Sequence, residues 1–506
     1  MSTLFSILEL SRRGLQTQQS ALQTSQQNIA NANTPGFHRQ SAIISTTPGF
    51  ITGGISTLGR VIQLGTGTAV SRVQRLRDVF VETQIIEVDQ RLNRLDEEQK
   101  GLERMEIVFN ELSETVDLNN TLSEFWASWE SLAQDPTNGG LRIDLRAKGA
   151  GLAADIRALY ASVADLQPDF GEDISIRVDR VNSLLHQLAG LHGDIVRVEG
   201  GMLEANDLRD LRDGIVGELS SLIDVKPFEN PDGTVTLFLN GRPVVQQFDV
   251  TELRVIPKID AATQDGVPSP SESLVKVVLA EPGRDIDIRI SEGAIGGLLR
   301  LQDEIVPAIL GDLDLFAFTL MRQVNQVHQK GIGLNGAAGG SFFQFRLPDA
   351  DGTISDGTTD LSLVSNQPPS RASATMDLTN DIKDNLNNIA AALSSARGDN
   401  RNALEIARLR DQAFLLEDSL TIDNFYNLAI ASLGGRGEET ARLLEGTQLV
   451  RNQLETRRES VSGVSLDEEL TNIIQFQHVF EAAARVVTTV DSMVDTVVNR
   501  MGLVGR

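Results

Sequence analysis

The fold follows from residues 465–501, which read SLDEELTNIIQFQHVFEAAARVVTTVDSMVDTVVNRM. Apolar side chains recur in this stretch at alternating steps of four and three residues, the spacing of a coiled-coil seam. Ser465 and Glu468 form a capping box at its start, and the neighbouring Asp467 and Glu469 suit the positive end of a helix dipole. We therefore predict one long helix that begins after Ser465.

A matching stripe lies near the start of the chain, where Leu8, Leu15, Leu22 and Ile29 recur every seven residues. Small or polar residues occupy the second seam position between them. A lone helix of this kind does not stay folded, because fixing each residue costs about 1–2 kcal/mol and burying a Leu or Val gains about 1.5–3 kcal/mol only where a partner covers it. The terminal helices are therefore predicted to pair. Either they satisfy only each other within a monomer, or the pair also packs against other subunits.

The predicted assembly interface combines the apolar positions of the two seams. On the C-terminal side only Gln477 and Asp491 interrupt its apolar character. The interface residues are Leu8, Leu15, Leu22, Ile29, Leu466, Leu470, Ile473, Phe480, Ala484, Val487, Val494, Val498 and Met501.

The composition limits the classes of partner. The chain has 506 residues, enough for two to four domains, and a formal net charge of -25, which argues against nucleic acid and anionic membrane surfaces as main partners. It contains no cysteine, so disulfides and thiolate metal sites are excluded. Residues 1–10 lack the basic region of a signal peptide, and no apolar stretch is long enough to span a membrane. These features alone favour a cytoplasmic location.

Along the chain, a first helix is expected from about residue 3 to 32, ending before Pro35 and Gly36. Residues 43–73 are expected to be extended, with a strand or two, and a second long helix follows from Asp78. Helical patterning continues to about residue 223 and returns at 294–330 and 378–462, separated in the second half by loops. Strand patterns fill the region between, and Asn240-Gly241 is a strong hairpin signal.

We therefore predict a mainly α fold with a β insert: paired N- and C-terminal coiled-coil helices, a long helical bundle and a small β-rich inserted domain. The expected divisions are a terminal assembly region at 1–65 and 463–506, a bundle at 66–225 and 291–462, and the insert at 226–290.

Residue patterns typical of catalysis or metal binding are missing from the sequence. The five histidines lack the spacing of a helical zinc site, and the loop that begins at Asp349 has Thr358 where a calcium loop needs an acid. The glycine-rich residues 336–340 lack the Gly-Lys-Ser/Thr ending of a phosphate loop. We predict no enzyme activity, no catalytic residues, no cofactor and no metal site.

The stretch NIANANTPGF at 28–37 resembles the N-terminal signature of bacterial flagellar rod, hook and hook-associated proteins. Its continuation, and residues 462–470, resemble the hook-associated protein 1 family, the hook-filament junction proteins, in particular. The chain departs from the family pattern at His38, where a small polar residue is usual, and in a short segment after Phe343. The motif residues are Asn28, Asn31, Asn33, Thr34, Pro35, Gly36, Phe37, Arg39 and Gln40.

The resemblance implies a structural subunit that forms a ring at the junction between hook and filament. It implies as partners other copies of the chain, hook protein on one side, hook-associated protein 3 on the other, and a flagellar export chaperone at the C-terminal helix. It also implies type III export without a cleaved signal peptide, which replaces the cytoplasmic expectation with a secreted, extracellular location on the flagellum. The alternatives are another flagellar axial subunit of the rod or hook, and a non-flagellar coiled-coil scaffold.

Overall fold

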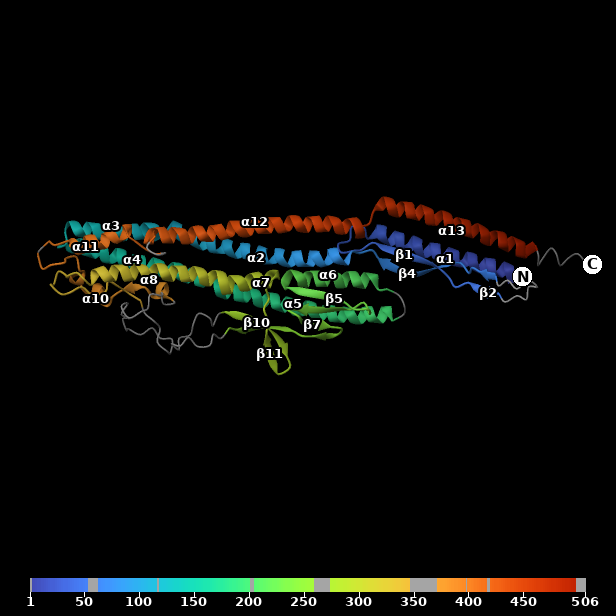
Figure 1. Cartoon of the computed structure of the whole chain (residues 1–506), viewed down its shortest axis with the longest axis horizontal. Coiled ribbons are helices and arrows are strands. Elements are labelled where there is room, and N and C mark those ends of the chain that lie inside the picture. The colour runs from blue at the N-terminus through green and yellow to red at the C-terminus, as the bar shows by residue number, and fades with distance from the viewer. Residues whose placement is uncertain are drawn as a thin grey trace, which may run out of the picture.

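The computed structural model describes residues 2–52, 62–115, 118–200, 204–258, 274–345, 371–396, 398–415 and 419–496. The molecule is elongated, with both terminal helices at one end, a helical bundle along the rest of its length and strands on one flank of the bundle (Figure 1). Long helices and a few small antiparallel sheets make up the fold, which confirms the predicted mainly α class with a β insert.

The terminal unit is built on two antiparallel helices, α1 (Ser2–Ala30) and α13 (Leu466–Asp495), which lie side by side (Figure 1). The predicted pairing of the terminal helices is thus confirmed. Two further strand pairs complete the unit, and Thr17 of α1 donates a hydrogen bond of 3.0 Å to the Thr68 carbonyl in one of them. The strand pairs are β1 (Gln40–Thr46) with β4 (Thr68–Arg75) and β2 (Phe50–Thr52) with β3 (Ile62–Leu64).

The paired strands β1 and β4 lie on either side of residue 65 in the sequence, and residue 65 was the expected end of the N-terminal part of this unit. Gln40 pairs with Arg75 at the far end of the hairpin. Because the two strands form one sheet, we propose that the terminal unit extends to Arg75.

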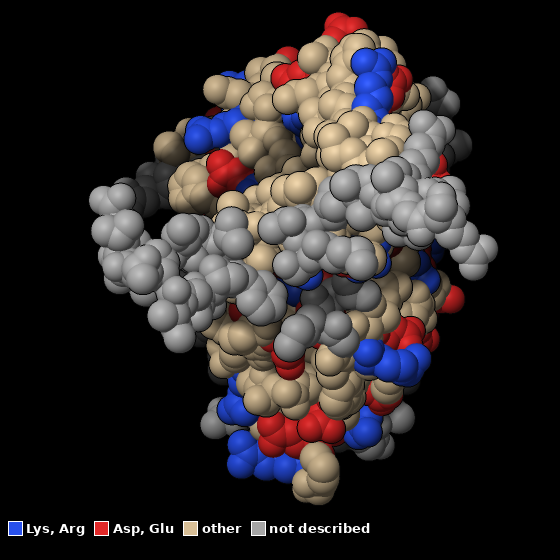
Figure 2. Space-filling model, turned by 90° about the vertical axis from the view of Figure 1, so that its right-hand side faces the viewer, with Lys and Arg blue, Asp and Glu red and all other residues tan. Residues whose placement is uncertain are grey.

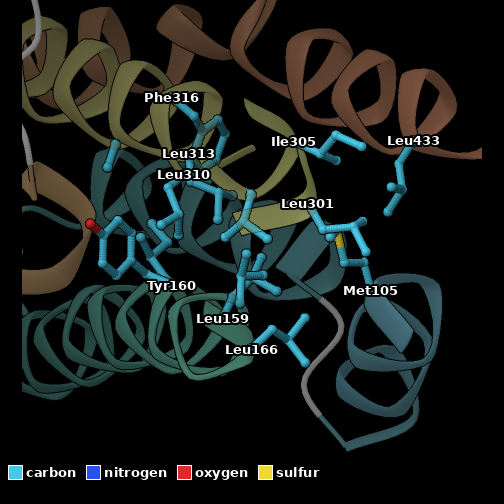
Figure 3. Close-up of a cluster of buried hydrophobic side chains, with 14 of the residues drawn as sticks. Met105, Leu159, Tyr160, Leu166, Leu301, Ile305, Leu310, Leu313, Phe316 and Leu433 are labelled. Carbon is cyan, nitrogen blue, oxygen red and sulfur yellow. The ribbon is translucent and has the colours of Figure 1, made fainter. Parts of the chain in front are cut away.

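The bundle surrounds a large apolar core. In Figure 3, side chains from α2, α4, α5, α8, α12 and the π-helical turn point toward one another. Gly101 on α2 permits close packing there, because a Cβ atom at this position would lie 2.3 Å from Leu301 Cδ1. The long bundle helices are α2 (Val79–Thr115), α3 (Leu118–Gln134), α4 (Gly139–Ala164), α5 (Leu166–Glu199), α6 (Asn206–Leu222), α7 (Gly293–Arg300), the π-helical turn (Leu301–Ile305), α8 (Val306–His328) and α12 (Ile422–Ser462).

The far end of the bundle is less regular than the predicted helix over 378–462. Buried Trp129 packs on Phe342 and His328 there, so loops and short elements share the core with the helices. Asn385 and Gly398, residues that favour turns, lie in this region, and Gly398 has a positive φ of 87°. The short elements are β12 (Phe343–Gln344), α9 (Ala372–Thr375), β13 (Asp377–Leu378), α10 (Asn380–Asp384), the 3₁₀ turns Leu386–Asn388 and Leu409–Asp411, α11 (Arg401–Arg408), β14 (Ala413–Leu415) and β15 (Leu420–Thr421).

The β insert consists of two small antiparallel sheets. The predicted hairpin is confirmed, because Asn240 and Gly241 join β6 to β7 with φ angles of 47° and 78°. Gln302 of the π-helical turn fastens the insert to the bundle through hydrogen bonds of 3.1 and 2.9 Å to the backbone of Val275. The first sheet contains β5 (Val225–Glu229), β6 (Val235–Leu239), β7 (Arg242–Gln246) and β8 (Asp249–Val250), and the second β9 (Leu253–Pro257), β10 (Val275–Glu281) and β11 (Arg284–Asp287).

Candidate functional site

The loop that follows α1 lies where the terminal helices meet the bundle, and it contains the sequence motif. Gly36 has a φ of 78°, a left-handed conformation that glycine adopts without strain. Thr34 donates a hydrogen bond of 3.3 Å to the Asn31 side chain, and Asn31 donates one of 3.0 Å to the Gln27 carbonyl. Asn33, Thr34 and Pro35 are exposed, and Phe37 is half-buried. The motif therefore forms a turn whose tip faces outward.

Asn28 closes this turn from inside. Its side chain is buried and forms two hydrogen bonds with the backbone of Gln40, donating to the carbonyl at 2.8 Å and accepting from the amide at 2.9 Å. An amide side chain carries both the donor and the acceptor that this arrangement needs. Asn28 thus fixes the position at which β1 starts.

Arg39 joins the motif to the C-terminal helix. Its guanidinium donates to Glu469 and to Glu468, each at 2.7 Å, and its backbone amide donates to the Ser462 carbonyl at 3.0 Å. These contacts hold the point at which α12 ends and α13 begins. The Ser465 side chain accepts a hydrogen bond from the Glu468 amide, as expected for the predicted cap.

The α1 stripe is partly covered in the structure. Leu8, Leu15, Leu22 and Ile29 are half-buried, and the small residues Ser11 and Ser25 between them are buried. Large side chains on α13 can therefore approach the α1 backbone.

The inward face of α13 differs in part from the predicted seam. Ile473, Val487 and Val494 are half-buried, as is Ala484, but Leu466 and Leu470 are each 52% exposed and Phe480 is 36% exposed. Val498 and Met501 lie outside the described residues. The other positions on α13 that are buried or half-buried are Glu469, Asn472, Phe476, Ala483 and Val490.

This pattern corrects the register of the intramolecular seam. Ile473, Val487 and Val494 belong to both the predicted seam and the observed inward face, but Glu469, Phe476, Ala483 and Val490 each lie one residue before a predicted seam position. The two polar interruptions of the predicted seam, Gln477 and Asp491, are accordingly exposed. The ion pair between Arg39 and buried Glu469 accounts for this difference in register, because it rotates α13 so that Glu469 faces the motif loop.

A second set of contacts joins the motif loop to the bundle, and the sequence patterns did not predict it. The ring of His38 lies between two carboxylates, with Nδ1 2.8 Å from Asp210 of α6 and Nε2 3.1 Å from Glu82 of α2. Burial acts to lower the pKa of His38, but hydrogen bonds and charge interactions with Asp210 and Glu82 raise it to about 9. The imidazole is therefore protonated at neutral pH and donates from both nitrogens.

Gln40 and Asn206 extend this contact with neutral side chains. Gln40 donates to Asp207 at 3.0 Å, and Asn206 donates to the Val73 carbonyl at 2.8 Å. A signal for this contact exists in the sequence, since residues 206–213 alternate acids and bases, but their partners are far away along the chain.

Within the described residues, the structure contains no cluster of three or more histidine or acidic side chains that could hold a metal ion. No helix in the same parts of the chain is both long and apolar enough to cross a membrane.

Both the terminal motif and the helical bundle match flagellar protein families. Residues 8–38 match the flagella basal body rod protein family, and residues 458–501 match the C-terminal family of flagellar basal body rod FlgEFG proteins. Residues 102–343 match the flagellar hook-associated protein FlgK helical domain. The paired terminal helices and their motif thus define a structural subunit of the bacterial flagellum.

Relatives are similar over the full length. Flagellar hook-associated protein 1 of Bacillus subtilis (strain 168) is 30% identical over 524 residues, with 100% of both chains covered. That of Escherichia coli (strain K12) is 26% identical over 572 residues, covering 98% of this chain and 99% of the relative. The chain therefore belongs to the flagellar hook-associated protein 1 family.

A solved structure shows the same fold. The flagellar hook junction protein FlgK from Burkholderia pseudomallei superposes with a TM-score of 0.62 at 15% identity, covering 75% of this chain and 100% of that one.

Proposed function

We propose that this subunit forms the junction between hook and filament, as a ring of copies joined through their terminal helices. Hook protein would lie on one side of the ring and hook-associated protein 3 on the other. The observation that carries this proposal is the apolar surface that α13 keeps exposed after it has paired with α1.

That surface lies on both flanks of the intramolecular seam. Leu466, Leu470 and Ile474 are exposed near the start of α13, while Val479, Val486 and Met493, seven residues apart, are exposed along its later turns. In the end-on view of Figure 2, the upper part of the molecule, where α13 lies, is mostly uncharged. Exposed large apolar side chains gathered along one helix are typical of a protein interface. The two flanks support contacts with two neighbours in an assembly.

We also propose that the subunit reaches the flagellum by type III export, without a cleaved signal peptide, and is secreted to the cell exterior. The same α13 surface would bind an export chaperone before assembly, in the manner of a helix held in an apolar groove. Shielding it would prevent premature association. The role is structural rather than enzymatic, in keeping with a family of flagellar structural proteins.

Removal of α13 tests the proposal. A chain that ends at Gly463 keeps the whole described bundle and β insert, so circular dichroism and thermal unfolding should still report a folded bundle. In a strain that produces only this chain, hooks should lack filaments when viewed by electron microscopy. Adding the purified truncated chain to such cells separates assembly from export, and filament growth after that addition would contradict the proposal. Full-length protein added in the same way is the control.

Amide hydrogen exchange on the monomer tests the coupling of order to assembly. If assembly orders the terminal helices, residues 2–40 and 465–496 should exchange much faster than the bundle. Strong protection of both helices in a proven monomer would show that they satisfy each other.

A further inference from the structure

We propose that the helical bundle bends at one level along its length, here called the waist, where three of its helical segments are interrupted or weakened. The waist comprises the junction of α4 with α5 at Asp165, the π-helical turn Leu301–Ile305 and residues 434–437 of α12. The inference rests on the proposed function only for its purpose, which is to let one subunit fit different neighbours on its two sides. The waist itself belongs to the bundle of the monomer.

Proline lies at two of these interruptions. Pro168 follows Asp165 in the first turn of α5, and Pro307 follows the π-helical turn in the first turn of α8. Among the described residues, no other proline lies inside a helix. A proline has no amide hydrogen, and its ring clashes with the carbonyl of the residue four positions earlier, so a regular helix cannot continue there. Those earlier residues are Ala164, the last of α4, and Asp303 of the π-helical turn.

Both prolines are exposed, so packing of the core does not require them. Other residues would fit the same positions and would favour a continuous helix. The two interruptions are therefore not a consequence of how the core is filled.

Glycine weakens the third segment. The α12 residues 434–437 read Gly-Gly-Arg-Gly, and only proline favours a helix interior less than glycine does. A Cβ atom at Gly434 or Gly435 would meet no described atom within 4 Å, so close packing does not require glycine at these two positions. At Gly437 a Cβ atom would lie 2.9 Å from Oε1 of Glu106, which is the end of a flexible side chain. The helix is thus weak at a place where stronger helix formers would fit.

All three segments contact residues 101–106 of α2, a stretch of about 8 Å along that helix at 1.5 Å per residue. The contacts are those of Leu301 with Gly101, of the Phe170 ring with the Arg104 guanidinium at 5.8 Å, and of Gly437 with Glu106. Two of the segments also touch each other, because Gln167 of α5 donates a hydrogen bond of 3.1 Å to the Gln302 carbonyl. The weak points therefore lie side by side in the bundle, although they are far apart in sequence.

The side chains between these segments are mostly aliphatic. In Figure 3, Met105 of α2 lies close to Leu301, and Ile305 and Leu433 of α12 point into the same region. Methionine adapts to gaps of irregular shape, because its side chain is unbranched and rotates about three bonds. Such a core can adjust when the segments around it tilt.

The two halves on either side of the waist have their own internal supports. In the far half, the rings of Trp129 and Phe342 pack with their centres 5.4 Å apart. In the half nearer the terminal helices, Asn182 of α5 holds the β insert through hydrogen bonds of 2.8 and 2.9 Å with the backbone of Leu253. Bending should therefore be concentrated at the waist, while each half keeps its shape.

Electron-electron double resonance between spin labels measures this bending, and introduced cysteines are unique labelling sites because the chain has none of its own. Ala154→Cys on α4 and Gln187→Cys on α5 place exposed labels on either side of the waist, about 50 Å apart along the helices at 1.5 Å per residue. Two control pairs lie within one half each: Ala154→Cys with Gln326→Cys in the far half, and Gln187→Cys with Gln448→Cys in the near half. The distance distribution across the waist should be about twofold wider than that of either control pair.

Replacing the weak points should remove the extra width. The stiffened variant combines Pro168→Ala, Pro307→Ala, Gly434→Ala and Gly435→Ala. Each change favours helix formation, and its distribution across the waist should be about half as wide as that of wild type. Gly446→Ala is the matched control, because a Cβ atom there also meets no described atom within 4 Å but the residue lies on α12 away from the waist. This control should leave the width unchanged.

A rigid bundle would give a wild-type distribution across the waist that is as narrow as both control pairs, and that result would overturn the proposal. Equal widths for wild type and the stiffened variant would do the same, as would equal narrowing by Gly446→Ala. If the stiffened variant loses helix content by circular dichroism, Gly434→Ala with Gly435→Ala alone replaces it and should still narrow the distribution. None of these measurements depends on the terminal helices or on filament assembly, so the waist and the proposed function can fail separately.

Discussion

Arg39, in the loop after α1, donates a hydrogen bond of 2.7 Å to Glu469 in the first turn of α13, 430 residues further along the chain. The Glu469 side chain is only 2% exposed, so the pair lies where water does not readily replace a lost partner. The motif loop thus holds the C-terminal helix at the place where the chain bends out of α12.

Replacing Arg39 with Ala should loosen the start of α13. The buried Glu469 carboxylate would lose its charged donor, and we expect a local cost of about 2 kcal/mol. Hydrogen exchange in the first turns of α13 should then be roughly 30-fold faster. Arg12→Ala is a suitable control, because the Arg12 and Glu9 pair is exposed on α1. Equal protection of α13 in the Arg39 variant and wild type would show that the ion pair does not hold the helix.

Asn28→Ala should release the start of β1. The change removes both hydrogen bonds to the Gln40 backbone at a buried position, for which we expect a cost of about 2–3 kcal/mol. Asn28→Asp should be similarly harmful, because a carboxylate cannot donate to the Gln40 carbonyl. Exchange of the amides in β1 measures the effect, with exposed Asn33→Ala as the control. If the amides of β1 exchanged at the wild-type rate in both Asn28 variants, Asn28 would not be what holds the start of β1.

The seam on α13 shows what the sequence could and could not predict. A 4-3 repeat is visible in the sequence of α13. Phe476 is adjacent to Gln477 and Val490 to Asp491, so apolar side chains fit two alternative registers of the seam. Both registers contain Ile473 and the positions that follow it at intervals of seven residues. Burial of Glu469 beside Arg39 favours one register, and that contact depends on tertiary structure. Local periodicity therefore predicts the helix and its approximate face, while its exact rotation requires the partner.

The contacts of His38 with Asp210 and Glu82 were not predicted for a related reason. Asp210 and Glu82 come from different helices, and isolated acids on amphipathic helices usually face solvent. The bundle and the hairpin at Asn240-Gly241 were predictable because their signals are local in sequence. The π-helical turn was not, since it depends on how Leu301 and Gln302 fit against α2 and β10.

Two buried histidines should make the bundle sensitive to acid. His328 Nδ1 donates to the Gly340 carbonyl at 2.6 Å, while Nε2 accepts from the Ala390 amide at 2.9 Å, so the ring is neutral. Burial lowers the pKa of His328 to about 4, and burial also lowers the pKa of His192, which makes an equivalent pair of backbone contacts.

As pH falls, a histidine in the unfolded chain binds a proton near pH 6.5, whereas the folded His328 ring binds one only near pH 4. The stability that the neutral His328 ring contributes is therefore complete above pH 6.5 and is lost as pH falls toward 4. For His328 the expected loss in the free energy of unfolding is about 3 kcal/mol. Denaturant unfolding across this range measures it. His328→Gln should lower stability at pH 7.5 and flatten the slope below pH 6.5, whereas exposed His478→Gln should leave the slope unchanged. An unaltered slope in the His328 variant would contradict the assignment.

Gly297 is predicted to be required where α7 crosses α2. A Cβ atom there would lie 2.6 Å from the Arg94 carbonyl oxygen, and backbone cannot move aside as a side chain can. Gly297→Ala should therefore destabilise the bundle by about 1–3 kcal/mol, measured by denaturant unfolding. Gly151→Ala on α4 is the matched control, since a Cβ atom at that position meets nothing within 4 Å. The Gly151→Ala variant should be more stable than wild type by about 0.5–1 kcal/mol. If Gly297→Ala were instead the more stable of the two variants, helix propensity rather than close packing would determine the change in the free energy of unfolding.

The exposed flank of α13 can be separated from its intramolecular seam by substitution. Leu466 and Leu470 are each 52% exposed, so the double variant Leu466→Gln with Leu470→Gln should change monomer stability by no more than about 0.5 kcal/mol. Filaments should nevertheless fail to attach, because neighbouring subunits would lose the apolar contact. Val490, which is buried, faces α1 instead, so Val490→Gln should destabilise the helix pair by about 2 kcal/mol. Leu211→Gln on α6 is the matched control for an exposed leucine, and it should leave both properties unchanged. If the double variant supports normal filaments, the flank does not contribute to the junction, and assembly must use another surface of the terminal unit.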